Sequence, residues 1–106
     1  MLKWGGSFTC IAPDYPGYGQ SEPLRITSPD INDFGDGLIE FLDVLGVNEV
    51  GMYGFHSGGA IAMNAHVRNP GRFTALACGG YPIWTDAEMA LYASGYLPSF
   101  KPTGYG

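Results

Sequence analysis

The sequence has little charge and few cysteines, and both shortages exclude classes of protein. Charged residues make up 14% of the 106, with five Lys and Arg against ten Asp and Glu. The net charge of −5 predicts no basic surface for nucleic acid or for an anionic membrane. Two cysteines are too few for a disulfide scaffold and lack metal-ligand spacing, so we expect Cys10 and Cys78 to be buried as small apolar side chains.

Long hydrophobic runs are missing as well. No run approaches the ~18 apolar residues of a membrane span, and the N-terminus lacks the apolar core of a signal peptide, so the cytoplasm is the expected compartment. The hydrophobic content of 45% is still enough for a core and unlike that of disordered chains. The length allows one domain at most, in which Gly and Pro stand between periodic segments as turns.

Strands and helices alternate in the predicted element order. Short apolar runs at 8–12, 47–54 and 73–78 predict buried parallel strands. Between and after them we expect a helix over 28–45, one of about ten residues that includes Ile61 and Val67, and a third over 85–95. This order predicts an α/β fold, a parallel sheet in three α/β/α layers, with ligands bound at the carboxyl ends of the strands.

Helix boundaries are marked by local signals. Ser28 is the expected N-cap of the first helix, with Pro29 at its first position and Gly46 as a left-handed C-terminal cap. Thr85 and Glu88 form a capping box that begins the third helix. The first helix presents one apolar face, formed by Ile31, Phe34, Leu38, Phe41 and Leu45.

The segment Gly54-Phe55-His56-Ser57-Gly58 joins the second strand to the second helix and resembles a nucleophile elbow, Gly-x-nucleophile-x-Gly. Such a corner lifts its central side chain above the sheet edge, and its flanking residues must be small because the chain and sheet approach closely. The helix that follows directs its dipole and a backbone N–H at a developing oxyanion.

Two registers of this corner are possible. With His56 at the centre, Gly54 and Gly58 flank it, whereas with Ser57 at the centre a phenylalanine takes a position that requires glycine. Sterics favour the first register, in which Ser57 supplies the backbone N–H after the central residue. A plain glycine-rich turn with a partly buried histidine is the alternative.

Several segments together resemble the α/β-hydrolase superfamily. The run from Phe8 to Ser21 is similar to its strand and loop [VI]-[IV]-A-P-D-x-x-G-x-G-x-S, and 69–73 to its P-x-R-[VF] motif. The rest of the chain resembles the start of the cap in an esterase-like subgroup that also carries His at the elbow. The resemblance implies that residues 1–80 are the central part of a hydrolase core and 81–106 the start of a cap. It also implies an internal fragment of a hydrolase of roughly 250–300 residues, whose missing remainder is the chain's partner.

The resemblance implies a hydrolase of ester-like or related small apolar substrates, with no metal or organic cofactor. His56 and Ser57 are the candidate catalytic residues, with His56 as nucleophile, general base or relic, and the acid and general base are expected outside this chain. A non-catalytic binding protein of the same fold is the second hypothesis, because His56 replaces the usual Ser, Asp or Cys. A third is a freestanding flavodoxin-like module, which predicts direct pairing of 8–12 with 49–54.

Other chemistry-bearing residues have structural interpretations. Asp14 is expected to be a turn residue and Asp86 to favour the dipole of the third helix. His66 lies about ten residues beyond the corner, too far along a helix to assist His56, and is expected at the surface. Four aromatic residues either line an apolar pocket or pack as core or lid: Tyr81, Trp84, Tyr92 and Tyr96.

Overall fold

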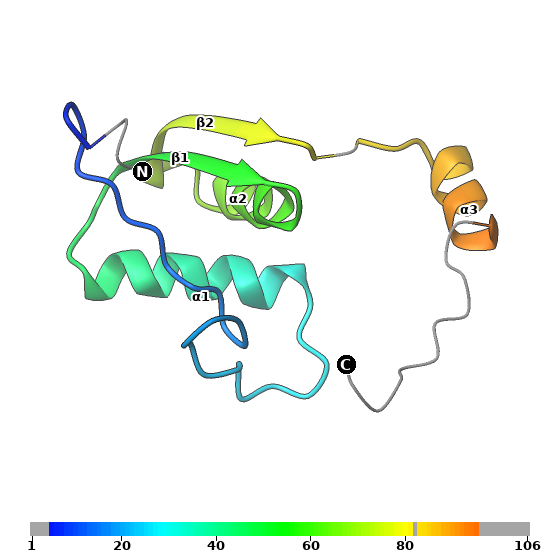
Figure 1. Cartoon of the computed structure of the whole chain (residues 1–106), viewed down its shortest axis with the longest axis horizontal. Helices are drawn as coiled ribbons and strands as arrows, with labels where there is room; N and C mark the ends of the chain where they lie inside the picture. The colour runs from blue at the N-terminus through cyan, green and yellow to red at the C-terminus, as the bar shows by residue number, and fades with distance from the viewer. Residues whose placement is uncertain (1–4, 82, 96–106) are drawn as a thin grey trace.

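The computed structural model describes residues 5–81 and 83–95. Two parallel strands, β1 (Val50–Phe55) and β2 (Phe73–Gly79), form the sheet, and helix α2 (Ser57–Arg68) connects them. Helix α1 (Ile31–Val44) precedes β1 and lies on the same side of the sheet as α2 (Figure 1). The alternation of strands and helices and the parallel pairing confirm the expected α/β fold.

Helix α1 begins at a different cap from the one expected. Asp30, rather than Ser28, is the N-cap, and its carboxylate accepts the backbone N–H groups of Asn32 and Asp33 at 2.7 and 3.2 Å. The Asp33 carboxylate in turn accepts the Asp30 N–H at 2.8 Å. This reciprocal capping box satisfies more amide donors than a single Ser28 hydroxyl could, so Pro29 lies outside the helix. Gly46 follows the helix with a φ of +70°, as expected of a left-handed cap.

The hydrophobic core lies between the two helices and the sheet. Leu38 and Leu42 of α1 pack with Ile61 and Ala65 of α2 and with Phe73 of β2. The expected apolar face of α1 is confirmed at Leu38, which is buried, and at Phe34 and Phe41, which pack against this core. Leu42 belongs to the core although the expected face did not include it, whereas Ile31 and Leu45 of that face are exposed. The core is small, and it covers one face of the sheet.

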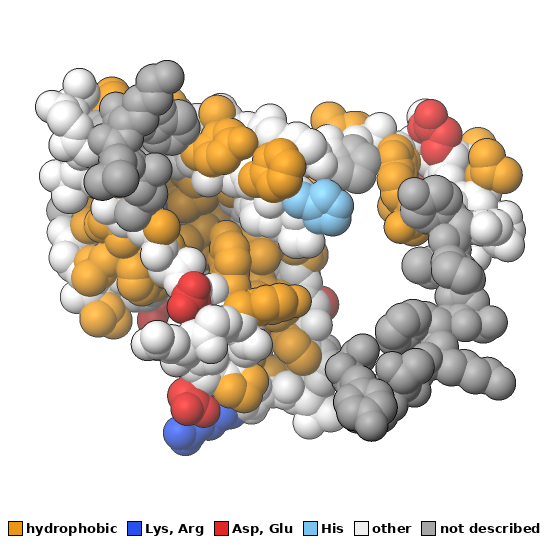
Figure 2. Space-filling view, viewed as in Figure 1, with side chains coloured by type: hydrophobic (Ala, Val, Ile, Leu, Met, Phe, Trp, Pro, Cys, Tyr) orange, Lys and Arg blue, Asp and Glu red, His pale blue; other side chains and the backbone are white. Residues whose placement is uncertain are grey.

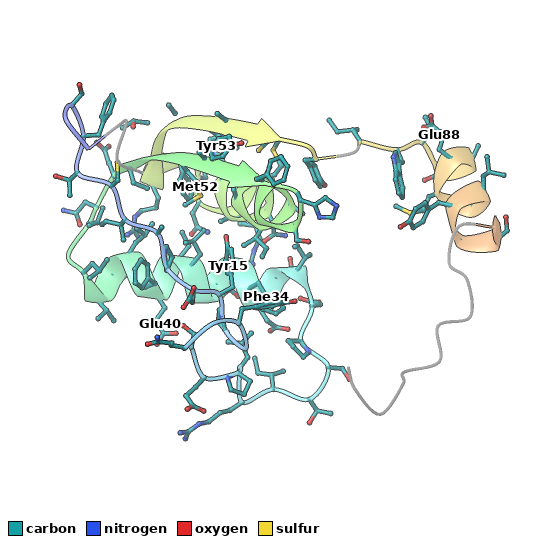
Figure 3. The ribbon with its side chains drawn as sticks, viewed as in Figure 1. Tyr15, Phe34, Glu40, Met52, Tyr53 and Glu88 are labelled. Carbon is teal, nitrogen blue, oxygen red and sulfur yellow. The ribbon has the colours of Figure 1, made fainter. Side chains whose placement is uncertain are left out.

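The other face of the sheet carries exposed apolar side chains. Val50, Met52 and Gly54 of β1 face the helices. Tyr53 (labelled in Figure 3) and Phe55 alternate to the opposite side and are 55% and 64% exposed. Figure 2 shows hydrophobic side chains open on the viewed surface along the strands, among few charged ones. Within residues 5–81 and 83–95, no helix covers this outer face, so the third layer of the expected sandwich is not formed by the described chain.

The strand predicted over 8–12 is wrong. These residues are irregular and pair with no strand in the described part of the chain. A strand is stable only when a neighbour takes up its backbone hydrogen bonds, and β1 pairs with β2 alone. The flavodoxin-like hypothesis required 8–12 to pair directly with 49–54, so it is also wrong.

Arg72 ties the connection after α1 to the start of β2. The short 3-10 helix η1 (Pro70–Arg72) ends α2 at Asn69, as the proline predicted. The Arg72 guanidinium donates to the carbonyls of Val47 and Asn48 at 2.9 and 2.7 Å and forms an ion pair with Asp43 at 2.7 Å. These bonds explain physically why an arginine precedes this strand.

Helix α3 (Asp86–Gly95) stands apart from the layers (Figure 1), and no residue in it is buried. Its capping box is confirmed, because Glu88 accepts the Thr85 N–H at 2.8 Å and the Thr85 hydroxyl accepts the Glu88 N–H at 3.3 Å. The division into a core (1–80) and a cap (81–106) stays a prediction. Much of the proposed cap lies outside the described residues.

Among residues 5–81 and 83–95, no helix is long and apolar enough to cross a membrane. The His, Cys, Asp and Glu side chains of these described residues form no group of three that could hold a metal ion.

Candidate active-site corner

The corner between β1 and α2 lies at the carboxyl end of the parallel sheet. Its tip is His56, which has φ 52° and ψ −119°, a conformation that L-residues rarely adopt. The His56 N–H donates to the carbonyl of Gly79 at 2.9 Å, so the tip is held against the end of β2. The backbone therefore adopts the register with His56 at the centre, and Ser57 is the first residue of α2.

Glycine is required beside the tip by close backbone contacts. A Cβ on Gly54 would lie 2.7 Å from the carbonyl carbon of Gly58 and 2.8 Å from the Cα of Gly59, and would collide with the Gly58 oxygen. A Cβ on Gly59 would lie 3.0 Å from the Cβ of Tyr81. Strand and helix thus approach each other through backbone atoms at Gly54, as the sequence pattern predicted. The same prediction is wrong for Gly58, because a Cβ there would meet only Tyr15 Cε2, at an ordinary distance of 3.9 Å.

The two candidate side chains meet at the tip. His56 Nδ1 lies 3.3 Å from Ser57 Oγ, within hydrogen-bond distance, and both side chains are exposed. Ser57 begins a helix of 12 residues, whose first backbone N–H groups have no partner within the helix and carry its positive dipole end. The corner thus combines a titratable ring, a hydroxyl and donors for an anion in one exposed place.

Tyr15 packs under this corner from the loop that precedes α1. Its ring lies against the core between α1 and the sheet (Figure 3), and its Cε2 is 3.9 Å from where a Cβ on Gly58 would lie. Burial raises the pKa of the Tyr15 phenol, so the hydroxyl stays protonated at neutral pH. Tyr15 supports the first turn of α2, a contact that its place in a Pro/Gly loop did not signal.

The two aspartates outside the corner are structural in this fold. Asp14 accepts the Gln20 N–H at 3.1 Å, and its main-chain carbonyl accepts the Ser21 hydroxyl at 2.8 Å, which closes the loop. Asp86 lies in the first turn of α3, apart from the corner. Both interpretations from the sequence agree with these positions.

Three burial predictions were wrong or partly so. His66 is half-buried rather than at the surface, because its ring packs edge-on against Phe73 with centroids 5.8 Å apart. Its Nδ1 is buried with no hydrogen-bond partner in the described structure. Cys78 is exposed rather than buried, since no described strand covers the outer edge of β2, and Cys10 is half-buried.

The aromatic side chains do not gather in one pocket. Trp84 and Tyr92 contact each other, with ring centroids 4.4 Å apart, beside α3. Tyr81 instead adjoins Gly59 at the corner. Tyr96 lies outside the described residues. Of the four aromatic residues expected to line an apolar pocket, Tyr81 is therefore the one that the described structure places at the corner.

The chain matches a known protein family over most of its length. A family model described as serine aminopeptidase, S33, matches residues 5–102, nearly the whole chain. The chain belongs to this family of the α/β-hydrolase superfamily. The match extends through residues 8–12, which form no strand here, and through the described residues after β2.

Curated relatives of this α/β-hydrolase chain are enzymes by name. Haloalkane dehalogenase 2 of Mycobacterium tuberculosis, and that of Mycobacterium bovis, are 31% identical over 98 residues, which is 92% of this chain and 34% of theirs. The dihydrolipoyllysine-residue acetyltransferase component of the acetoin cleaving system of Cupriavidus necator is 28% identical over 91 residues, 86% of this chain and 24% of that protein. The chain thus spans about a third or less of the length of these relatives.

Proposed function

We propose that the protein that carries this chain is a hydrolase that cleaves ester-like bonds in small apolar substrates, with its reaction centred on His56 and Ser57. The observation that supports it best is the backbone of His56. A non-glycine residue with positive φ, two positions after a glycine that backbone contacts require, costs free energy and persists where a side chain must be presented for function.

The chemistry available at the corner suits acyl transfer. The first N–H groups of α2 can stabilise the negative charge that develops on a carbonyl oxygen under attack. The imidazole of His56 can accept or donate a proton, the role that histidine takes most often in general acid–base catalysis. The exposed apolar side chains near the corner, such as Phe55 and Tyr81, favour a substrate of low polarity.

The test is ester hydrolysis by the full-length protein that carries this chain. We expect turnover of p-nitrophenyl acetate or butyrate, and His56→Ala to lower kcat/KM by about 100-fold or more, the usual contribution of a proton-transfer group. His66→Gln is the matched control, because this second histidine packs on Phe73 away from the corner; it should keep most of the activity.

Two results would overturn the proposal. One is an equal loss in both histidine variants with the fold intact by circular dichroism. The other is halide release from a 1-haloalkane that is much faster than ester hydrolysis, since curated relatives are haloalkane dehalogenases. Binding of the esters without turnover would support the non-catalytic hypothesis instead.

A further inference from the structure

A shallow groove of about 290 Å³ lies along α2, and we call it the α2 groove. Its apolar lining comes from parts of the chain that are far apart in sequence: Ile31 begins α1, Ala60, Met63 and Val67 belong to α2, and Tyr81 follows β2. The volume is near the lower end of the range for small-molecule sites, about 300–1,000 Å³. Apart from Tyr81, none of these side chains adjoins the corner.

The α2 groove begins beside the corner. Ser57 lies one turn before Ala60, and Val67 lies two turns beyond Ala60, so the three residues share one side of the helix. The step from Ser57 to Ala60 is ~4.5 Å along the helix axis. Tyr81 adjoins the same turn, because a Cβ on Gly59 would lie 3.0 Å from its Cβ. A substrate that reacts at the corner can therefore extend over Ala60 into the groove.

The polar side chains that line the groove are bonded to α1. Arg68 forms its ion pair with Asp36 at 2.7 Å and donates to the Asn32 carbonyl at 3.1 Å. Asn64 donates to the Asn32 side chain at 3.0 Å. Because Asp36 balances the charge of Arg68, the arginine contributes mainly its aliphatic stem to the lining. The groove thus favours a neutral apolar group over an anionic head group.

We propose that the α2 groove binds a straight alkyl chain of the substrate, so that the preferred substrates are neutral esters with an alkyl chain of about eight carbons. This inference rests on the proposed hydrolase function and names its substrate class. Ala60 and Val67 lie about 10 Å apart along the helix, roughly the length of an extended chain of eight carbons. Met63 lies between them, and its unbranched, flexible side chain can adapt to the path of the alkyl chain.

Binding in this groove should depend on chain length in a graded way. A CH2 group that leaves water completely strengthens binding about fourfold. The groove is shallow and open to solvent along one side, so we expect about half of this free energy, or about twofold for each CH2 group. The gain should end where the groove ends, at Val67.

The test is the dependence of ester hydrolysis on chain length, measured on the full-length protein that carries this chain. p-Nitrophenyl esters from acetate to decanoate vary the acyl chain, and 1-alkyl acetates vary the alcohol, all below their micelle concentrations. In one of the two series we expect kcat/KM to rise about 16-fold from four to eight carbons and then to level off. The rise should lie mainly in KM, because the alkyl chain is bound alike before and during the reaction.

Val67→Trp should remove this gain. Val67 is 69% exposed, so the larger side chain needs no space in the core. A helical side chain leans toward the N-terminus of its helix, which places the indole over Met63. We expect the ratio of kcat/KM for the eight-carbon ester to that for the acetate to fall about 10-fold.

Val44→Trp is the matched control, because Val44 is 81% exposed at the other end of α1 from Ile31. It should leave this ratio unchanged. A flat length series from an active protein would overturn the inference and leave the proposed hydrolase function standing. The same holds if Val67→Trp keeps the ratio, or if the two tryptophan variants lower it equally. If no ester of either series is hydrolysed, both proposals fail.

Discussion

His56 adopts a backbone conformation that costs a non-glycine residue on the order of 1–3 kcal/mol. The surrounding contacts impose it. The Gly79 carbonyl holds its N–H, and its own carbonyl accepts the N–H groups of Gly59 and Ala60 at 2.9 and 3.3 Å. At the scale of single residues, the corner is therefore a set of backbone constraints around one histidine.

Gly54→Ala should destabilise the protein. The new Cβ would meet backbone atoms of Gly58 and Gly59, which cannot rotate away as a side chain could. We expect a loss of about 1–3 kcal/mol, the usual cost of overpacking, and a parallel loss of ester hydrolysis as the corner opens. Urea denaturation followed by circular dichroism measures the first quantity.

Gly51→Ala is the control for this variant on the same strand. A Cβ there would lie 3.9 Å from Thr74 Oγ1, an ordinary contact, so the midpoint should stay unchanged or rise slightly. Equal midpoints for the two alanine variants would mean that the close approach at Gly54 is not needed.

At the scale of elements, α1 is held by its ends as well as by its apolar face. Asp30 and Asp33 close its first turn, and Arg68 of α2 pairs with Asp36 at 2.7 Å. The side chain of Asn64 donates to the Asn32 side chain at 3.0 Å. A Cβ on Gly35 would lie 2.5 Å from Asn64 Oδ1 and 3.7 Å from the backbone nitrogen of Ala65, so the two helices pack closely there and the Asn64 side chain would have to shift.

The cap of α1 makes a pH-dependent contribution to stability. Hydrogen bonds from the backbone N–H groups of Asn32 and Asp33 lower the pKa of Asp30. A carboxyl with a lowered pKa in the folded state stabilises that state fully above its unfolded pKa of ~4 and loses this contribution as the pH falls through the folded value. Asp30→Asn should keep the cap at pH 7 but weaken the drop in stability between about pH 5 and 3.

Urea midpoints at pH 7 and at pH 3.5 measure this effect. Asp30→Ala is the comparison, because it loses the cap and should lower the midpoint already at pH 7. Some dependence on pH should persist in Asp30→Asn, since hydrogen bonds from Thr85 also lower the pKa of Glu88. An Asn variant with the full wild-type drop would show that Asp30 does not contribute to it.

At the scale of the whole molecule, one face of the two-stranded sheet packs against the hydrophobic core and the other is exposed. Tyr53 and Phe55 lie on the open face with Ala75 and Ala77 of β2, and both outer strand edges lack a described neighbour. Exposed apolar sheets with unpaired edges associate with other surfaces. In a complete α/β-hydrolase, the resemblance implies further strands and helices at these places.

The 106-residue chain by itself should therefore self-associate. We expect oligomers by size-exclusion chromatography with light scattering at micromolar concentration, and a shift toward monomer in Phe55→Thr. Val44→Thr removes a comparably exposed side chain from α1 rather than from the sheet, and should leave the oligomers unchanged. A monomeric wild-type chain would contradict this expectation.

The sequence by itself determined the features that depend on neighbouring residues. The helices, the capping box at Thr85, the stop at Asn69–Pro70 and the corner with His56 at its tip follow from glycine, proline and cap chemistry within a few positions. The family resemblance rests on the same local motifs.

Only the tertiary structure decided the features that need a distant partner. Residues 8–12 have strand-forming side chains but no adjacent strand, and Cys78 is exposed because nothing described covers its edge. His66 is half-buried because Phe73 folds back against it. The pairing of His56 with Ser57 likewise depends on side-chain directions, which the strained backbone at the corner sets and which spacing along the chain does not reveal.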